Sequence, residues 1–369
     1  MNRRKAALGL ATILTATISA ACGSGDTTGA DSDFVKLVVP PTGPLQPSMA
    51  MQASAPEVLG YWSDEGVEID DPTIEGAAAM QMLATGEIDA VVVTASQAVA
   101  TIAAGAPIKI IASYVNTNIW RPYVPVDSDI QSPEDFEGKV IGVHSLDSGG
   151  VPMFDTLMST VGMSNDDVDI VAAGTGADVV ALFEAGRIDA YSASDGHQAL
   201  IQAEMPTRPV SNEEFDDIGF HVAIAVNTES LETKREALVG YLRGVYKSVA
   251  VARANPEAVV AMLYGQHEEL RPAGMETAEI IEQLTPGLEA RLENMSPVDG
   301  LDGNADVSQI EGHVEAMVES GTFELPSGQS VEEFVKDFWD PSLLEEANDF
   351  DKAALMAEAE QWSWDDFIE

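Results

Sequence analysis

Hydrophobic and polar positions repeat along this chain at an offset of one hundred residues. The segment MLATGEIDAVVVTASQ (82–97) aligns with LFEAGRIDAYSASDGH (182–197). The identical positions are Gly86/Gly186, Ile88/Ile188, Asp89/Asp189 and Ala90/Ala190. In each copy the pattern predicts a helix that ends at the glycine, then a short apolar strand and a polar loop. The flanking segments KLVV and KVIG, and VEID and VDIV, match at about the same offset.

Each half of the chain therefore alternates strand and helix three times. This alternation predicts an α/β fold in which mainly parallel sheets are covered by helices on both faces. We expect two Rossmann-like lobes joined by a two-segment hinge, with one crossing in 113–125 and a second near Gly219. Lobe 1 begins with residues 35–114 and lobe 2 spans 115–218. Residues 219–369 return to lobe 1 and end in a helical wrap, and the hinge is expected to close around a ligand.

Ligands of open α/β sheets bind outside the carboxyl ends of the strands. Loops 40–46 and 94–97 of lobe 1 should therefore face loops 144–150, 172–178 and 193–197 of lobe 2 across a cleft. The candidate ligand-binding residues in these loops and at the hinge are Thr42, Gln46, Ser96, Tyr114, Trp120, Arg121, Ser145, Ser148, Gly149, Thr175 and Asp195.

A helix predicted to start near Gly149 should direct backbone N–H groups into the cleft, which favours an anionic ligand group. Ser145 and Ser148 add hydroxyl donors, although Ser148 is equally explained as a helix cap. Another feature argues against an anionic ligand, because the cleft loops contain Asp147, Asp178 and Asp195 and no lysine or arginine. An unpaired carboxylate beside an anion is costly.

Arg121, next to Trp120, is the one cation that the sequence places to compensate these carboxylates. The carboxylate of Asp195 instead suits a ligand with amino or ring N–H donors. Tyr114, Trp120 and Tyr123 offer aromatic surface for stacking on a flat ring, or else pack the crossing.

The N-terminal segment MNRRKAALGLATILTATISAA has the basic start, apolar run and small residues of an export signal, so residues 1–21 are predicted to be a signal peptide. Sixteen helical residues would cover roughly 24 Å of a hydrocarbon layer of about 30 Å, too little to span it. Cleavage leaves Cys22 first, which resembles a lipoprotein attachment site. Residues 22–34 then form a lipid-anchored flexible tether. The alternative is an unmodified Cys22 on a freely secreted protein.

The chain is strongly acidic, with 18 Lys and Arg against 62 Asp and Glu and a formal net charge of −44. Phosphate binding needs clustered cations, so nucleic acid is excluded as a partner. The charge indicates either a saline setting or simply an acidic solvated surface. The five histidines have no metal-ligand spacing, and no cofactor or metal motif is found. Because Cys22 is the sole cysteine, no disulfide is expected.

Four further segments carry a family resemblance in order and spacing: LGYWSDEGVEID (59–70), TGEIDAVVVTASQAVATIAAGAPIKIIAS (85–113), SPEDFEGKVIGV (132–143) and ANPEAV (254–259). They resemble the substrate-binding lipoproteins of ABC importers, in the subgroup for aliphatic sulfonates, nitrate and thiamine-pyrimidine precursors. The likeness covers about 36–265, with a weaker match at 334–347. Where relatives often have Glu-Pro, this chain has Asp195-Gly196.

The resemblance implies a type 2 periplasmic-binding-protein fold and a monomer that binds one small molecule. It also implies delivery to a membrane permease driven by an ATPase, on the outer face of the cell membrane. We expect no catalysis and favour a neutral or amine-bearing heterocycle such as a pyrimidine precursor over a sulfonate or carboxylate. One alternative is a pyrimidine-precursor synthase of the same fold, which depends on a cysteine-rich motif missing here. Another is a ligand-sensing receptor for a signalling partner.

Overall fold

Residues 35–39, 45–72, 74, 76–146, 148–202, 204–272 and 274–368 are described by the structure, which is a computed structural model. The predictions about the signal peptide, the tether, Cys22, Thr42 and Asp147 lie outside these residues. None of the described helices is both long and apolar enough to cross a membrane.

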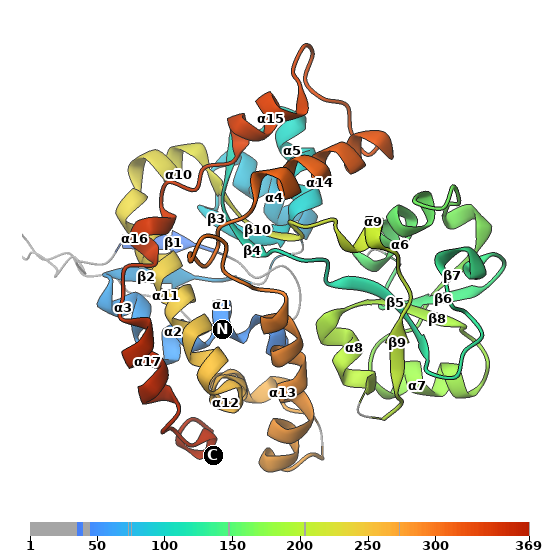
Figure 1. Ribbon diagram of the computed structural model, residues 1–369. Helices are drawn as coiled ribbons and strands as arrows, with labels where there is room; N and C mark the ends of the chain where they lie inside the picture. Colours follow the sequence, from blue (N-terminus) through green and yellow to red (C-terminus); the bar gives the residue numbers. More distant parts are fainter. Residues whose placement is uncertain are drawn as a thin grey trace, which may run out of the picture. The chain divides into compact units, whose positions relative to one another are not determined.

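Strands rich in valine, isoleucine and alanine form the sheets of the first lobe (Figure 1). Strand β1 (Val35–Val38) pairs in parallel with β2 (Val67–Asp70). Strand β10 (Val222–Asn227) lies between β3 (Ala90–Thr94) and β4 (Ile108–Val115) and is antiparallel to both. The helices up to β4 are η1 (Pro47–Met49), α1 (Ala50–Ala53), α2 (Ala55–Val58), α3 (Tyr61–Asp64), α4 (Gly76–Thr85) and α5 (Ala95–Ala103).

The second lobe has one five-stranded sheet in the order β7-β6-β8-β5-β9. Its strands are β5 (Trp120–Pro125), β6 (Val140–Val143), β7 (Asp169–Ala172), β8 (Ala190–Ser194) and β9 (Thr207–Pro209). Strand β6 is parallel to β7 and β8, whereas β5 is antiparallel to β8 and β9. The helices are η2 (Pro133–Phe136), α6 (Gly150–Ser159), η3 (Asn165–Asp167), α7 (Ala177–Glu184), α8 (Asp195–Gln202) and α9 (Glu213–Asp216).

After β10 the described chain is helical. Its helices are α10 (Thr228–Thr233), α11 (Arg235–Ala254), α12 (Pro256–Gln266), η4 (Glu268–Leu270), α13 (Thr277–Glu293), α14 (Val307–Glu319), α15 (Val331–Phe338), α16 (Leu344–Ala347), α17 (Lys352–Ala359) and η5 (Trp364–Asp366). Residues of α14 and α15 pack against β3, β4 and β10 in one apolar cluster. The α/β fold is confirmed, but the five-stranded sheet is mixed and the three-stranded sheet is antiparallel, rather than mainly parallel. The reason is that β5 and β10 each enter their sheet directly from a crossing between the lobes and run against their neighbours.

The sequence repeat corresponds to one local structure built twice. Gly86 and Gly186 end their helices with φ of 76° and 61°, the left-handed conformation that favours glycine. The Asp89 carboxylate accepts a hydrogen bond from Val38 N–H at 2.9 Å, and the Asp189 carboxylate accepts one from Val140 N–H at 2.8 Å. Each aspartate therefore ties the strand that follows it to an earlier strand of its lobe, β1 for Asp89 and β6 for Asp189.

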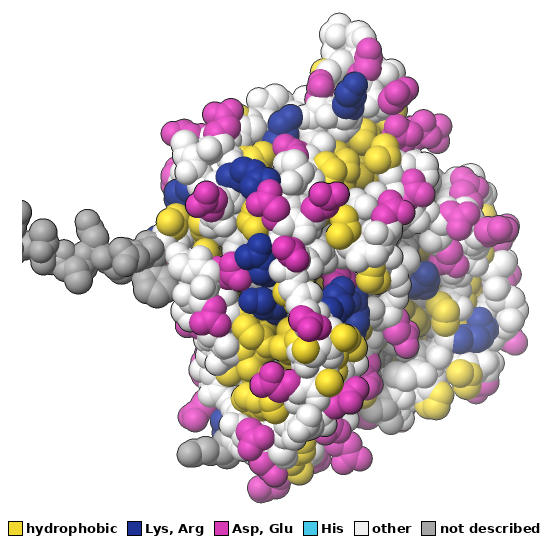
Figure 2. Space-filling view, turned by 60° about the vertical axis from the view of Figure 1, so that its left-hand side comes forward, with side chains coloured by type: hydrophobic (Ala, Val, Ile, Leu, Met, Phe, Trp, Pro, Cys, Tyr) yellow, Lys and Arg dark blue, Asp and Glu magenta, His cyan; other side chains and the backbone are white. Residues whose placement is uncertain are grey.

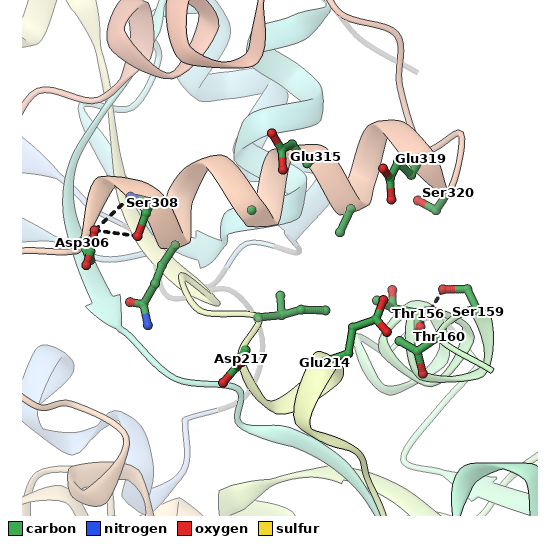
Figure 3. A pocket seen from close by; sticks show the side chains of 14 residues that line it. Thr156, Ser159, Thr160, Glu214, Asp217, Asp306, Ser308, Glu315, Glu319 and Ser320 are labelled. Atoms are coloured by element: carbon green, nitrogen blue, oxygen red, sulfur yellow. Dashed lines mark hydrogen bonds between the residues drawn. The ribbon is translucent and has the colours of Figure 1, made fainter. Parts of the chain in front are cut away.

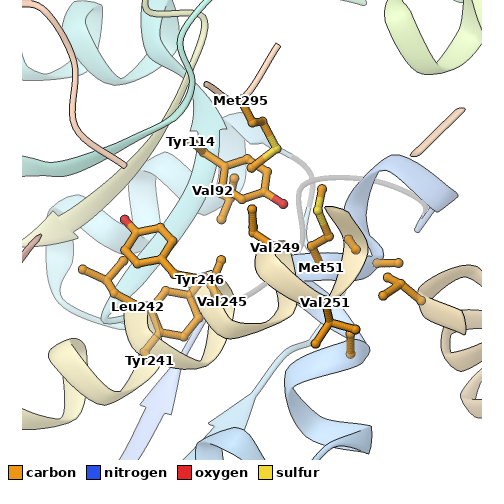
Figure 4. Packing of buried hydrophobic residues seen from close by; sticks show 14 of the residues in the cluster. Met51, Val92, Tyr114, Tyr241, Leu242, Val245, Tyr246, Val249, Val251 and Met295 are labelled. Carbon is orange, nitrogen blue, oxygen red and sulfur yellow. The ribbon is translucent and has the colours of Figure 1, made fainter. Parts of the chain in front are cut away.

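Helix α11 forms the centre of the largest apolar cluster (Figure 4). Tyr241, Leu242, Val245, Tyr246 and Val249 are buried on this helix. They pack with residues of β3, β4 and the segment after α13. Tyr114 of β4, which was predicted to reach a ligand, is 2 % exposed and belongs to this core.

The cations of α11 are all paired with acidic side chains (Figure 2). Arg235 pairs with Glu346 at 2.6 Å, and Arg253 with Asp302 at 2.8 Å. Figure 2 shows Lys and Arg side chains (blue) interspersed with Asp and Glu side chains (magenta) on one face of the molecule. The cations of α11 thus tie this helix to α16, to the residue after α3 and to the turn at Asp302.

Candidate functional site

A cavity of about 210 Å³ lies where the carboxyl end of β3 faces the start of α6. Thr94 caps α5 directly after β3, and its hydroxyl accepts a hydrogen bond from Gln97 N–H. This tight strand-to-helix connection brings Thr94, Ser96 and Gln97 to one wall. The complete lining is Thr94, Ser96, Gln97, Trp120, Leu146, Ser148, Gly149, Val151, Pro152, Met153 and His221.

The opposite wall joins two features that were predicted separately, the start of α6 and the aromatic hinge. A Cβ added at Gly149 would lie 2.8 Å from Trp120 Cζ2, so the indole ring rests directly on the backbone at the start of α6. The Ser148 hydroxyl is buried and has no hydrogen-bond partner among the described residues. A buried hydroxyl without a partner costs free energy that a ligand can recover.

Two buried histidines extend the first wall. Ser96 Oγ lies 3.1 Å from His313 Nε2, and the ring centroids of His221 and His313 are 5.7 Å apart. Burial lowers the pKa of His221 to about 3 and that of His313 to about 4, so both rings are neutral at pH 7. No side chain that lines this cavity carries a formal charge at that pH. The sequence did not identify His313, because 217 residues separate it from Ser96.

Four of the predicted residues line this cavity: Ser96, Trp120, Ser148 and Gly149. Tyr114 lies in the core, and Thr175 belongs to the loop after the edge strand β7. Ser145 is half-buried in the loop before α6, and Gln46 precedes η1 beside Gly196. These four residues and their roles toward a ligand stay predictions.

Arg121, the cation expected to compensate the cleft carboxylates, has an acidic partner, and its role toward a ligand stays a prediction. Arg121 Nε donates to Asp216 Oδ1 at 2.9 Å, so this guanidinium is paired on the second lobe. Asp195 has a cation of its own, because Arg291 Nε and Nη2 each donate to its carboxylate at 2.8 Å. Arg291 comes from α13, a helix whose position the sequence did not predict.

A larger cavity of about 720 Å³ lies between α14 and the helices α6 and α9 (Figure 3). Five carboxylates line it, from Glu214, Asp217, Asp306, Glu315 and Glu319, and no cation or aromatic ring does. It includes none of the predicted residues. The smaller cavity combines an aromatic face with hydroxyl and amide groups, the usual composition of a small-molecule site. Within the described residues, no three His, Cys, Asp or Glu side chains group to hold a metal ion.

Comparison with known proteins agrees with this architecture. A family model described as NMT1/THI5 like matches residues 53–259. A solved structure from Bordetella bronchiseptica RB50 covers 86 % of this chain and 98 % of its own, at 16 % identity and a TM-score of 0.61. The periplasmic aliphatic sulphonate binding protein SsuA from Escherichia coli covers 82 % and 96 %, at 16 % identity and 0.59. No curated protein matches the chain.

The alkanesulfonate-binding protein SsuA from Xanthomonas axonopodis pv. citri, bound to MOPS, covers 82 % of this chain and 97 % of its own. Its identity is 14 % and its TM-score 0.57. At such identities these structures show a shared fold, which is the two-lobed periplasmic-binding-protein fold. The fold class and the family resemblance inferred from the sequence are confirmed.

Proposed function

This chain belongs to the NMT1/THI5-like family, and on that premise we propose that it is an extracytoplasmic solute-binding protein of an ABC importer. The sulfonate-binding SsuA proteins that share its fold support this role. The observation that carries the proposal is the small cavity at the start of α6. There Trp120, Ser148 and Gly149 of one wall face Thr94 and Ser96 of the other.

The cavity favours a small neutral or amine-bearing heterocycle, such as a thiamine pyrimidine precursor. Trp120 offers a flat ring for stacking, and Ser148, Gln97 and Thr94 offer hydrogen bonds without charge. A sulfonate or carboxylate is the second candidate, held by the first amides of α6. It lacks a lining cation, because Arg121 is paired with Asp216 and Arg291 with Asp195.

The remaining parts of the proposal concern how the receptor works. Residues 1–21 would direct export, and lipidation of Cys22 would hold the monomer at the outer face of the membrane beside its permease. Tethering keeps the receptor at a high effective concentration near the permease, so modest affinity suffices for delivery.

The first experiment identifies the solute. Protein purified natively in high salt is denatured, and the released small molecules are identified by mass spectrometry. A nitrogen heterocycle supports stacking on Trp120, whereas a sulfonate or carboxylate moves the contact to the amides of α6. Protein that releases no solute and shows no ligand-dependent change in small-angle scattering with candidates of either class contradicts the proposal.

A pair of matched variants then locates the site. Ser148→Ala removes the buried hydroxyl of the small cavity and is expected to weaken binding of the identified solute about 5- to 10-fold, the value of one hydrogen bond. Ser159→Ala removes an exposed hydroxyl from the large cavity and should leave affinity unchanged. Calorimetry that shows the reverse order would move the site to the large cavity.

A further inference from the structure

The contact between Asp195 and Arg291 joins the two lobes. Asp195 is the first residue of α8 and follows β8 of the five-stranded sheet. Arg291 lies near the end of α13, which packs against α8 itself and, in the other lobe, against α12 and η1. The guanidinium makes two hydrogen bonds of 2.8 Å to the carboxylate, and Asn294 Nδ2 adds a third at 3.3 Å.

This pair is deeply buried. Asp195 is 5 % exposed and Arg291 is 7 % exposed. The backbone next to it is equally close-packed, because a Cβ added at Gly196 would lie 3.2 Å from Ser48 Oγ of η1. Both charges therefore lose their water when the lobes meet, and each becomes the other's main compensation.

The charge of the lobes makes such a contact significant. Residues 115–218 contain four Lys and Arg and 19 Asp and Glu, a formal charge of −15. The rest of the chain is also acidic, so the two lobes repel each other. Arg291 brings a positive charge from one lobe into contact with the other, on α13 rather than on the hinge.

We propose that Asp195 and Arg291 form a latch that holds the two lobes together in the absence of any ligand. Arg291 lies beyond residue 259, where the match to the family model ends. The latch thus joins Asp195, which lies inside the family-model match, to Arg291, which lies beyond its end. In this role the carboxylate of Asp195 binds Arg291 rather than a ligand.

Removal of one partner gives a clear expectation. In Arg291→Met, closure would bury the Asp195 carboxylate without a counter-charge, whereas opening returns it to water. The closed-to-open ratio should fall about 100-fold or more, the usual effect of breaking a buried pair from one side. In the double variant Asp195→Asn/Arg291→Met no charge is buried alone, so most of the closed population should return.

The test measures the distance between the lobes by pulsed electron paramagnetic resonance, without ligand. The mature chain with Cys22→Ser carries spin labels at Glu184→Cys on α7 and Glu282→Cys on α13, both exposed. We expect one narrow distance distribution with the native pair and a longer, broader one for Arg291→Met. Because no solute is added, this result is independent of the proposed function.

The matched control is Arg253→Met, which breaks the pair with Asp302 at 2.8 Å inside the first lobe. It should lower the melting temperature without changing the distance. Circular dichroism establishes that each variant is folded, and Asp195→Asn gives a second reading if Arg291→Met does not fold. The proposal is overturned if Arg291→Met and Asp195→Asn keep the native distribution, or if Arg253→Met lengthens the distance equally.

Discussion

Replacing Asp89 by asparagine should destabilise the protein much more than the same change at Asp189, its counterpart in the repeat. Both carboxylates accept a hydrogen bond from the backbone N–H of a strand residue, Val38 of β1 or Val140 of β6. Asp89 is 5 % exposed and also accepts hydrogen bonds from Ser230 Oγ at 2.7 Å and from Lys234 Nζ at 2.8 and 3.0 Å. Asp189 is exposed and has no such additional partner recorded among the described residues.

The expected loss in the free energy of unfolding follows from these contacts. An asparagine can still accept the backbone hydrogen bond, so Asp189→Asn should cost less than about 1 kcal/mol. Asp89→Asn also loses the charge-assisted bonds from Lys234, which is about one third exposed and therefore partly screened. We expect a loss of about 2–3 kcal/mol in the free energy of unfolding.

The assay is urea unfolding followed by far-ultraviolet circular dichroism at pH 7, with both variants compared at equal m-value. The pH dependence supplies a second check. Burial alone would raise the pKa of Asp89, but hydrogen bonds from Lys234, Ser230 and Val38 together lower it. Its contribution is therefore present above the unfolded pKa of about 4 and is lost as pH falls through the lower folded pKa. Equal losses for the two variants would refute the reasoning.

Three further predictions concern acid, packing and salt. Burial lowers the pKa of His197 and His313 to about 4 and that of His221 to about 3, so below pH 6.5 the unfolded chain binds more protons than the folded chain. The urea concentration at the unfolding midpoint should therefore fall as the pH is lowered from 6.5 to 4, and it should fall less steeply in His313→Gln. An unchanged slope in that variant would count against a neutral His313. A Cβ at Gly244 would lie 2.6 Å from Trp62 Nε1, so Gly244→Ala should lower the free energy of unfolding by about 1–3 kcal/mol, although alanine has the better helix propensity. A thermal melt measures this loss, and an unchanged melting temperature would show that Trp62 can move. Carboxylates of α9 and α14 line the large cavity and repel one another across it. Spin labels at Ser159→Cys and Ser320→Cys should therefore approach each other as KCl rises from 0.1 to 1 M and the screening length falls from about 10 to 3 Å. A distance that does not depend on salt would mean that the repulsion between the carboxylates is negligible.

The repeat allowed the sequence to predict the local structure around Asp89 and Asp189. A helix end at glycine and an aspartate three residues later are encoded within sixteen residues, and in both copies the aspartate accepts a hydrogen bond from a backbone N–H. The start of α6 was predicted for the same reason, because strand, turn and helix follow each other directly, but its contact with Trp120 of β5 was not. Such features depend on neighbours in the chain.

The partners of the site could not be predicted in this way. Arg291 is 96 residues from Asp195, and His313 is 217 residues from Ser96. The pattern of α13 and α14 predicts helices but does not say which neighbour each helix contacts. Thr175 was placed in the cleft because its loop follows a strand, but that strand, β7, lies at the edge of the sheet. Tyr114 was expected to stack on a ligand or else to pack the crossing, and it packs with α11.

Placement of β10 in the first lobe affects the order in which the chain can fold during synthesis. All strands of the five-stranded sheet lie within residues 120–209, whereas the sheet that contains β3 and β4 is completed by β10, at residues 222–227. A chain that emerges from its N-terminus can therefore complete the later lobe first. Until then β3 and β4 each expose an apolar strand edge to other chains. The growing polypeptide is thus most prone to aggregation while it is nearly two thirds made, before its central strand has emerged.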